Sequence, residues 1–521
     1  MSRLREGLFL VLALAGCPSA DPVETAGSMT TSGSTTVVEP TSTGSGSTDL
    51  LTTSAEPVST GATTSTGTTS TTSGGTTSSG TTSSGDGGTG PSSGGEEDAS
   101  SGTAGEECVH CDGNCEVRVA PEPDANPAWA MICGTATWEQ APRVAAVGGG
   151  DVFVAFQFAQ AGVGDVSLTL GEVFTHEGGG DVILARLAAD GVLKWSRSWG
   201  GSGSVWPVGA VAAPQDRIVI AGKFAGTFVV DGQSLGCDDC HGGFVVVLDG
   251  DGGLVWRRLL TIDEFEVYTF DIVGPAVGPD GAVIVGGFYM SDIDFGGGEV
   301  SPITNANGYL LALEPGGQDR FLRLLRTAGE PETVTAVSAG PDGSIAFAGS
   351  FHGHDLDLGN GVTAHIDLQG QKTYGAKLTA QDKALWVSGP FARAAIDDAG
   401  DVAYVGTTIA FHTPSGALGW TVEPAPDCEG GFEGFIGFVA PDRFEQVMAT
   451  KGSSTTCVTA VDLGGAPLWT QHVKVPVGES AAFAGDGATI LAGEADALFE
   501  LLGPWAPVGE TDVWVTRVTP P

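Results

Sequence analysis

Two short patterns contain residues that could bind a metal or a cofactor. Cys237-Asp-Asp-Cys240-His241 has the CxxCH spacing that attaches c-type haem, and the same two thiols could instead form a disulfide. We favour the disulfide, because an apolar strand follows the motif at once and leaves little room for a porphyrin. His352 and His354 alternate along the chain, so their side chains point the same way, but no third metal ligand accompanies them.

Aspartates form a second group of candidate ligands. The segments 231–235, 294–298 and 357–361 each begin with Asp and contain a turn glycine. One interpretation is calcium bound by loop carboxylates, with the candidates Asp292, Asp294, Asp355 and Asp357. The other is a turn in which the aspartate side chain accepts backbone hydrogen bonds. We favour the turn, because the pattern recurs and no twelve-residue calcium loop is present.

The established signatures of catalysis are missing from the sequence. It contains no HExxH metal motif, no GxxxxGK[ST] phosphate loop and no convincing nucleophile elbow after a strand. We therefore expect a protein that binds a partner rather than an enzyme, and we predict no resident cofactor. A cation-dependent hydrolase or lyase remains the enzymatic alternative.

The elements that must position any site are strands, because a β-rich run ending in a small residue recurs along the chain. We find seven such runs: 152–156, 218–222, 282–286, 345–349, 402–406, 445–449 and 489–493. A turn glycine with an aromatic four residues later follows each of the first six. These pairs are Gly191/Trp195, Gly252/Trp256, Gly317/Phe321, Gly370/Tyr374, Gly416/Trp420 and Gly465/Trp469.

Each repeat is predicted to form four short antiparallel strands. Apolar β-branched runs alternate with glycine-containing turns, and the chain's 82 glycines and 28 prolines disfavour helices. The small residue would end the second strand and the aromatic would lie in the fourth. One such sheet cannot bury both faces, whereas similar sheets stacked around an axis bury each other's faces. We expect the repeated aromatics to pack between neighbouring sheets.

The last repeat lacks the glycine-plus-aromatic strand. A strand-like segment, Trp129-Ala-Met-Ile132, precedes the first repeat without partners of its own. We therefore predict that residues 128–136 supply the missing fourth strand and close the ring.

With these repeats, residues 128–521 resemble bacterial seven-bladed β-propeller repeat proteins. The segment 248–256, with Asp249, Gly252 and Trp256, is also similar to the xDxxGxxxW pattern of quinoprotein-type tryptophan repeats. The resemblance implies an all-β, seven-bladed propeller, and its quinoprotein part implies an oxidoreductase as a further enzymatic alternative.

In a propeller of this kind, the loops between the second and third strands of each blade lie on one face of the ring. The loops that lead from one blade to the next lie on the same face. Several of these connections look long here, as at 223–243 and 379–392, and long loops on a rigid scaffold commonly bind ligands. The residues predicted to form this binding face are Trp206, Phe265, Glu266, Tyr268, His352, His354, Trp386, Phe391, Glu429 and Phe432.

The N-terminus predicts export. Arg3 and Arg5 precede the apolar run 8–15, which is too short to span a bilayer. The next residues, Leu14-Ala15-Gly16-Cys17, resemble the lipobox of bacterial lipoproteins. That resemblance implies a signal peptide at 1–16, lipid on Cys17 and attachment to a membrane. Because Pro18 rather than Asp follows the cysteine, it favours the outer membrane or the cell surface.

Residues 17–107 are predicted to be a disordered stalk after the lipid. From about Ser28 this segment is almost only Ser, Thr and Gly, which cannot bury enough apolar surface to fold. The chain's formal net charge of −41 makes nucleic acid and anionic lipid surfaces poor partners. We expect a monomer whose partner is a protein, an envelope component or a glycan. The functional alternative is an envelope assembly or scaffold factor.

The eight cysteines other than Cys17 form an even set in an oxidising compartment, which favours disulfides. A lead-in at 108–127 contains three of them, and a zinc site there with His110 is the alternative. The disulfide candidates are Cys108, Cys111, Cys115, Cys133, Cys237, Cys240, Cys428 and Cys457.

Overall fold

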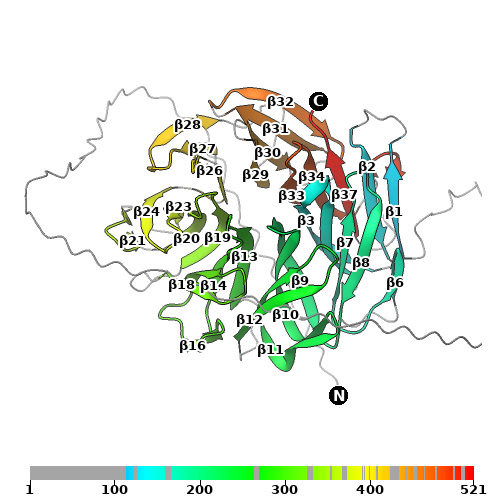
Figure 1. Cartoon of the computed structure of the whole chain (residues 1–521), viewed down its shortest axis with the longest axis horizontal. Coiled ribbons are helices and arrows are strands. Elements are labelled where there is room, and N and C mark those ends of the chain that lie inside the picture. Colours follow the sequence, from blue (N-terminus) through cyan, green and yellow to red (C-terminus); the bar gives the residue numbers. More distant parts are fainter. Residues whose placement is uncertain are drawn as a thin grey trace, which may run out of the picture. The chain divides into compact units, whose positions relative to one another are not determined.

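The computed structural model describes residues within 113–521 (Figure 1). Its gaps are 121–125, 136, 159–165, 263–268, 326–331, 353–354, 366–371, 390, 392, 398, 406–408, 423–432, 441–442, 450–454, 463, 476–477, 497–498 and 506–510. Apart from one 3-10 turn, Gly148–Gly150, every regular element within the described ranges is a strand. None of the described elements is a helix capable of crossing a membrane. The predicted signal peptide, Cys17 and the stalk lie outside the described residues.

Seven sheets of four or more strands account for most of this part of the chain. The first comprises β3 (Glu139–Ala146), β4 (Val152–Phe158), β7 (Asp181–Leu187) and β8 (Leu193–Trp199). The second comprises β9 (Ser204–Ala213), β10 (Arg217–Val230), β11 (Gln233–Leu248) and β12 (Leu254–Ile262), with the short β15 (Ile293–Asp294) and β16 (Glu299–Val300) at its edge. The third comprises β13 (Phe270–Val277), β14 (Val283–Tyr289), β17 (Asn307–Leu313) and β18 (Asp319–Leu324).

The other sheets repeat this order. The fourth comprises β19 (Glu332–Ala339), β20 (Ile345–Phe351), β23 (Lys372–Leu378) and β24 (Ala384–Ser388). The fifth comprises β25 (Arg393–Ile396), β26 (Val402–Val405), β27 (Ile409–His412) and β28 (Leu418–Val422), and the sixth β29 (Glu433–Ala440), β30 (Arg443–Ala449), β31 (Thr456–Asp462) and β32 (Pro467–Val473). Two small hairpins stand apart, β21 (Asp355–Asp357) with β22 (Thr363–His365) and β35 (Phe499–Glu500) with β36 (Pro504–Trp505).

The seventh sheet joins the two ends of the described chain. Its strands β33 (Gly478–Phe483), β34 (Thr489–Ala495) and β37 (Asp512–Val518) are followed in space by β2 (Trp129–Gly134). The register runs from Trp129 opposite Arg517 to Cys133 opposite Val513. The predicted pairing of this early segment with the last strand is therefore present. Beyond β2 the sheet continues through β1 (Asn114–Val119), β5 (Ser167–Leu170) and β6 (Glu172–Thr175).

The first strands of the seven sheets contact one another in cyclic order. Strand β3 contacts β9, β9 contacts β13, and the series continues through β19, β25, β29 and β33, which contacts β3 again (Figure 1). The second and third strands lie outside this inner set, and in the first sheet both of them, β4 and β7, are wholly buried. The apolar cores therefore lie between adjacent sheets.

The predicted landmarks fall where expected in most sheets. The recurrent apolar runs form the second strands, and Trp195, Trp256, Phe321, Trp420 and Trp469 all lie in fourth strands. The assignment of Tyr374 was wrong, because Tyr374 lies in β23, the third strand of its sheet.

In that sheet the fourth-strand aromatic is Trp386, and the turn position four residues earlier is Asp382. Asp382 has a φ of 64°, the left-handed conformation that glycine adopts most easily. The glycine-plus-aromatic pattern did not predict this position, because Asp occupies the turn in place of Gly.

The repeated tryptophans connect neighbouring sheets. The indole N–H of Trp195 donates to the carbonyl of Gly250, and that of Trp256 donates to the carbonyl of Pro315. In each case the acceptor lies in the turn between the third and fourth strands of the next sheet. Trp386 makes the equivalent bond to Pro414 at 3.1 Å. The predicted contact between sheets is therefore confirmed for Trp195 and Trp256, and Trp386 makes it in place of Tyr374.

The connections between second and third strands are shaped differently from the prediction. Residues 223–243 form most of a long hairpin of β10 and β11, so this segment is strand rather than loop. The segment 379–392 contains β24, so it is not a long loop either. Long stretches of the predicted binding face are therefore regular sheet.

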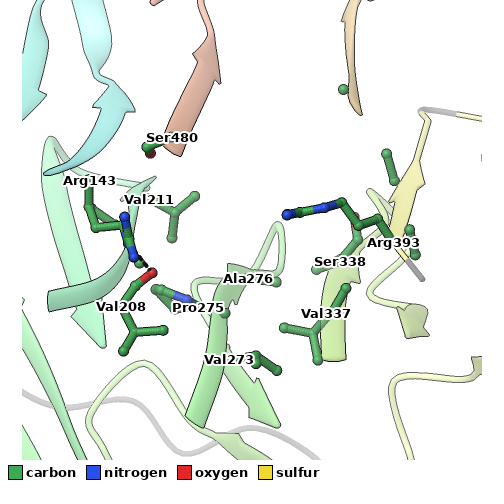
Figure 2. A pocket seen from close by; sticks show the side chains of 18 of the residues that line it. Arg143, Val208, Val211, Val273, Pro275, Ala276, Val337, Ser338, Arg393 and Ser480 are labelled. Carbon is green, nitrogen blue, oxygen red and sulfur yellow. Dashed lines mark hydrogen bonds between the residues drawn. The ribbon is translucent and has the colours of Figure 1, made fainter. Parts of the chain in front are cut away.

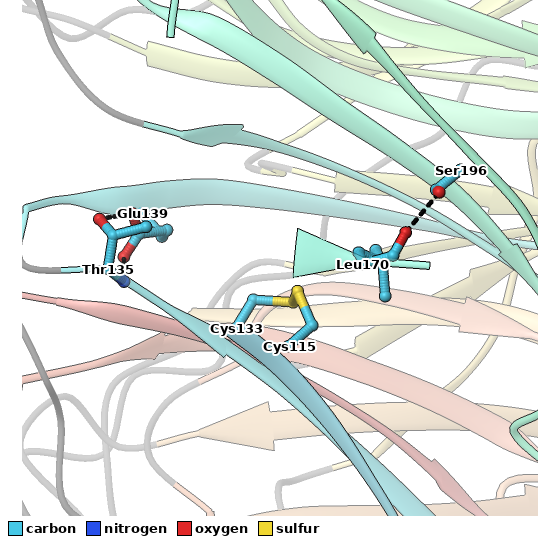
Figure 3. The surroundings of a disulfide bond; sticks show 6 residues. All are labelled: Cys115, Cys133, Thr135, Glu139, Leu170 and Ser196. Atoms are coloured by element: carbon cyan, nitrogen blue, oxygen red, sulfur yellow. Dashed lines mark hydrogen bonds between the residues drawn. A yellow bond between two sulfur atoms is a disulfide. The ribbon is translucent and has the colours of Figure 1, made fainter. Parts of the chain in front are cut away.

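Two disulfides are present among the described residues. Cys115 in β1 bonds to Cys133, its direct partner in β2 (Figure 3). Cys237 bonds to Cys240. Cys457 is also disulfide-bonded. The disulfide prediction is confirmed for these cysteines, whereas Cys108, Cys111, Cys428 and the zinc alternative with His110 lie outside the described residues.

Candidate functional site

A cavity of about 560 Å³ lies among the first strands of the seven sheets (Figure 2). All seven first strands contribute to its wall, mostly through valine, alanine and glycine. The charged residues of the described wall are Arg143, Arg393 and Glu479. This volume lies within the range of small-molecule sites in proteins.

Short side chains and close backbone contacts leave room for this cavity. Gly209 of β9 lies against β13, where an added Cβ would be 1.8 Å from the carbonyl oxygen of Gly274. Any larger residue at position 209 would force these two strands apart. The sequence therefore brings the inner strands close together and leaves the centre for a few long charged side chains.

A β-bulge positions Arg143 in the wall. The pairing of β3 with β4 shifts register between Gln140 and Arg143, and Ala141 in this bulge has a φ of 54°. Bulges commonly redirect a side chain next to a functional site. Similar register shifts occur where β13, β19 and β33 pair with their second strands.

The guanidinium of Arg143 is held by neighbouring backbone. Its Nε donates to the carbonyl of Val208 on β9 at 2.6 Å, and Nη1 donates to the carbonyl of Pro142 at 2.8 Å. Nη1 also lies 3.9 Å from a carboxylate oxygen of Glu479 on β33. Burial lowers the pKa of Arg143, and the charges of Glu479 and Glu494 oppose that shift. An arginine remains charged under such conditions.

Glu479 and Glu494 form a carboxyl pair beside this arginine. Burial, then the charge of Glu479, raises the pKa of Glu494 to about 7. Glu494 also accepts the backbone N–H of Ala141 at 2.6 Å. A hydrogen bond between the two carboxyl groups adds to the shift, so the pair holds a proton at mildly acidic pH.

Arg393 approaches the cavity from another wall. It is the first residue of β25, and Figure 2 shows its guanidinium reaching into the space between that strand and Arg143. Ser338 and Ser480 add hydroxyl groups to the described wall. The cavity therefore combines two guanidinium groups with a wall of mostly small residues that leaves backbone polar groups accessible.

A further carboxyl of raised pKa lies at the start of β3. Glu139 is fully buried and accepts hydrogen bonds from the backbone N–H and the hydroxyl of Thr135 (Figure 3). Burial raises its pKa to about 7, and the nearby charge of Asp512 contributes in the same direction. Glu139 also pairs through its backbone with Thr511, so it lies where the first and seventh sheets meet.

The residues predicted from loop length do not gather at this cavity. Trp386 stacks on His412, Phe391 stacks on Tyr404, and both Trp386 and Phe391 are buried rather than displayed on a surface. Trp206 lies in β9 and His352 directly follows β20. The remaining predicted face residues, Phe265, Glu266, Tyr268, His354, Glu429 and Phe432, lie outside the described residues.

Two of the four aspartate candidates, Asp294 and Asp357, act as turn acceptors. One carboxylate oxygen of Asp294 accepts the backbone N–H groups of Gly296 and Gly298, and Asp357 accepts that of Gly359. Asp292 is exposed, and Asp355 begins the β21 hairpin. Within the described ranges no three His, Cys, Asp or Glu side chains form a metal-binding group. Cys237 and Cys240 are bonded to each other next to His241, as the disulfide interpretation requires.

Sequence reasoning missed Arg143, Arg393 and the carboxyl pair. A signal was present, because each arginine starts an otherwise apolar run, Arg143-Val-Ala-Ala-Val147 and Arg393-Ala-Ala-Ile396, in a chain with only 22 basic residues. A lone cation at the start of a buried strand needs a polar or solvent-filled space.

Comparison with known proteins gives similarity in structure only. No protein-family model and no curated protein matches the sequence. A protein of unknown function from Dyadobacter fermentans is 11% identical, with 73% of this chain and 94% of that chain covered and a TM-score of 0.34. The Dos1 propeller is 10% identical (78% and 92% covered, TM-score 0.32), and a leech intramolecular trans-sialidase is 10% identical (74% and 68% covered, TM-score 0.33). The chain is all-β in its described part, and the solved structures similar to it include propellers.

Proposed function

We propose that this chain is an exported lipoprotein whose β-propeller is a binding module, with its ligand site in the central cavity. The observation that carries the proposal is the cavity of about 560 Å³, into whose wall Arg143 and Arg393 bring charge. A few charged side chains that converge on a concave cavity are typical of sites that orient a ligand. The partner is an envelope component, a glycan or a protein that carries the matching group.

The proposal includes a closed ring of seven blades. It is supported by seven sheets that repeat one strand order, by the cyclic contacts of their first strands, and by the pairing of β2 with β37. The tryptophan bonds link consecutive sheets in the same order, from Trp129 to Ala189 and from Trp195 to Gly250.

Anchoring at Cys17 is the second part of the proposal. It is supported by the charged residues, the apolar run and the lipobox-like sequence that ends at this cysteine. We propose an outer-membrane or cell-surface location, with residues 17–107 as a tether. Cells fed a labelled palmitate analogue should label the wild-type protein and not the Cys17→Ser variant. Label retained on that variant would exclude lipidation at this position.

Photo-crosslinking tests whether the cavity binds a ligand. Thr335 lies in β19, is exposed and lines the cavity, so a benzophenone amino acid placed there samples the cavity in the full-length lipoprotein. Irradiation of intact cells should give an adduct of defined mass on this variant. The matched control carries the same group at Val173, an exposed residue of the outer strand β6.

The comparison of the two sites decides the outcome. An adduct at Thr335 that is missing at Val173 supports a ligand in the cavity. Equal labelling at both positions, or none at Thr335, would argue against the cavity as the binding site.

The carboxyl pair favours a second candidate, a hydrolase or lyase. A carboxyl group with a pKa of about 7 beside a cavity can act as a general acid, and Glu494 has such a pKa next to Glu479. If the protein converts its cavity ligand into a product, the result supports the enzyme. If the ligand is recovered unchanged, the result supports the binding module.

A further inference from the structure

We infer that the central cavity recognises the carboxylate group of a small organic acid, with Arg143 and Arg393 as the residues that hold it. This inference rests on the proposed binding function and specifies its ligand class. It is carried by the placement of two guanidinium groups in one cavity and by the hydrogen-bond pattern that fixes one of them.

Arg143 is already oriented for a ligand. Its Nε and one N–H of Nη1 are used by the carbonyls of Val208 and Pro142, which come from two different segments. These bonds fix the plane of the guanidinium, so a ligand would not have to order a flexible side chain. The Nη2 side of the group makes no hydrogen bond with the described residues, and its two N–H groups remain available as donors.

Arg393 supplies a second planar donor set from a different sheet. Its side chain extends from β25 into the cavity, whereas Arg143 extends from β3 (Figure 2). Guanidinium groups bind carboxylates through two parallel N–H···O bonds, which gives both strength and orientation. Two such groups in one cavity disfavour cations and favour an anion.

The charged residues of the wall limit how much negative charge a ligand can carry. Two of the described wall residues are cationic and Glu479 is anionic. Glu479 is already near Arg143, at 3.9 Å, so a doubly charged phosphate or sulfate would lie close to this carboxylate. A monocarboxylate brings less negative charge close to Glu479, and the valine and alanine side chains of the wall suit its carbon skeleton.

Titration calorimetry on the purified full-length lipoprotein tests the inference. The probes are acetate and glucuronate, with acetamide and glucose as their uncharged counterparts. The two acids distinguish a simple organic acid from a sugar acid. We expect at least one acid to bind while its uncharged counterpart gives at least tenfold weaker binding.

Variants connect the binding to the two arginines. Arg393→Gln should weaken the acid at least tenfold, and Arg393→Lys should weaken it less because the charge remains. The matched control is Arg257→Gln, which alters an exposed arginine of β12 and should leave the dissociation constant unchanged. Arg143→Gln should also weaken binding, and its melting temperature reports whether the lost backbone bonds have disturbed the fold.

Two results would overturn the carboxylate inference. One is that each acid binds no more tightly than its uncharged counterpart, or that none of these probes binds. The other is an unchanged dissociation constant in both Arg393 variants. The crosslinking at Thr335 distinguishes a failure of this inference from a failure of the proposed function. An adduct with a neutral compound would contradict the carboxylate inference but would still support the cavity as a binding site.

Discussion

Replacing Trp129 with alanine should lower the free energy of unfolding by about 4 kcal/mol, the range measured for truncating large buried aromatics. Trp129 is fully buried in β2, and its indole N–H donates to the carbonyl of Ala189 at 3.0 Å. Its ring lies against Gly191, where an added Cβ would be 2.9 Å from the indole. The substitution therefore leaves a void between the first and seventh sheets and one unpaired carbonyl.

The measurement is thermal and urea unfolding of the variant beside the wild type. Trp138→Ala is the control, because Trp138 is 37% exposed and lies nine residues farther along the chain. This control should lose clearly less unfolding free energy than Trp129→Ala, because more than a third of the Trp138 side chain is already in solvent. If the two variants lost equal stability, the packing of β2 between these sheets would not matter for the fold.

Replacing Glu139 with glutamine should remove a pH dependence of stability. Glu139 is fully buried, and its pKa rises from 4.5 in the unfolded chain to about 7 in the folded protein, mainly because of burial. The folded protein therefore keeps a proton that the unfolded chain loses above pH 4.5. Stability from this group is fully present below about pH 4.5 and is lost as the pH rises to about 7.

The size of this effect follows from the shift. A difference of about 2.5 pKa units corresponds to about 3 kcal/mol. Between pH 4.5 and 8, the unfolding free energy of the wild type should fall by about 3 kcal/mol more than that of Glu139→Gln. The variant should therefore be the more stable protein at pH 8. Because Glu494 also has a pKa of about 7, some slope should persist in the variant. Identical profiles for the two proteins would show that the Glu139 carboxyl does not titrate as described.

The repeat could be read from the sequence because its signals are local. Turn glycines, an aromatic at a fixed offset and apolar second strands each reflect the needs of one sheet, and they placed Trp195 and Trp256 correctly. The missing aromatic strand of the last repeat also pointed to Trp129. The prediction failed where a residue other than glycine adopts the left-handed conformation of the turn, as Asp382 does.

The site could not be read in the same way because it depends on several sheets at once. Arg143 and Arg393 are 250 positions apart, and only the arrangement of first strands brings them to one cavity. Loop length was a poor guide, since the long segment 223–243 pairs with itself as a hairpin. The raised pKa of Glu494 likewise depends on Glu479 and on burial by neighbouring strands, which no local pattern encodes.

The disulfide between Cys115 and Cys133 determines where a mechanical load would enter the sheets. If residues before 113 tether the protein to a membrane, a pull on that tether reaches Cys115 first and passes through the sulfur atoms to Cys133. The intervening residues, which include most of β1 and β2, form a covalent loop that carries no tension. The pull therefore reaches the end of β2 and the chain that leads into β3, and it does not peel β2 from β37 starting at Trp129. A reduced protein would lose this protection and should open under a smaller force.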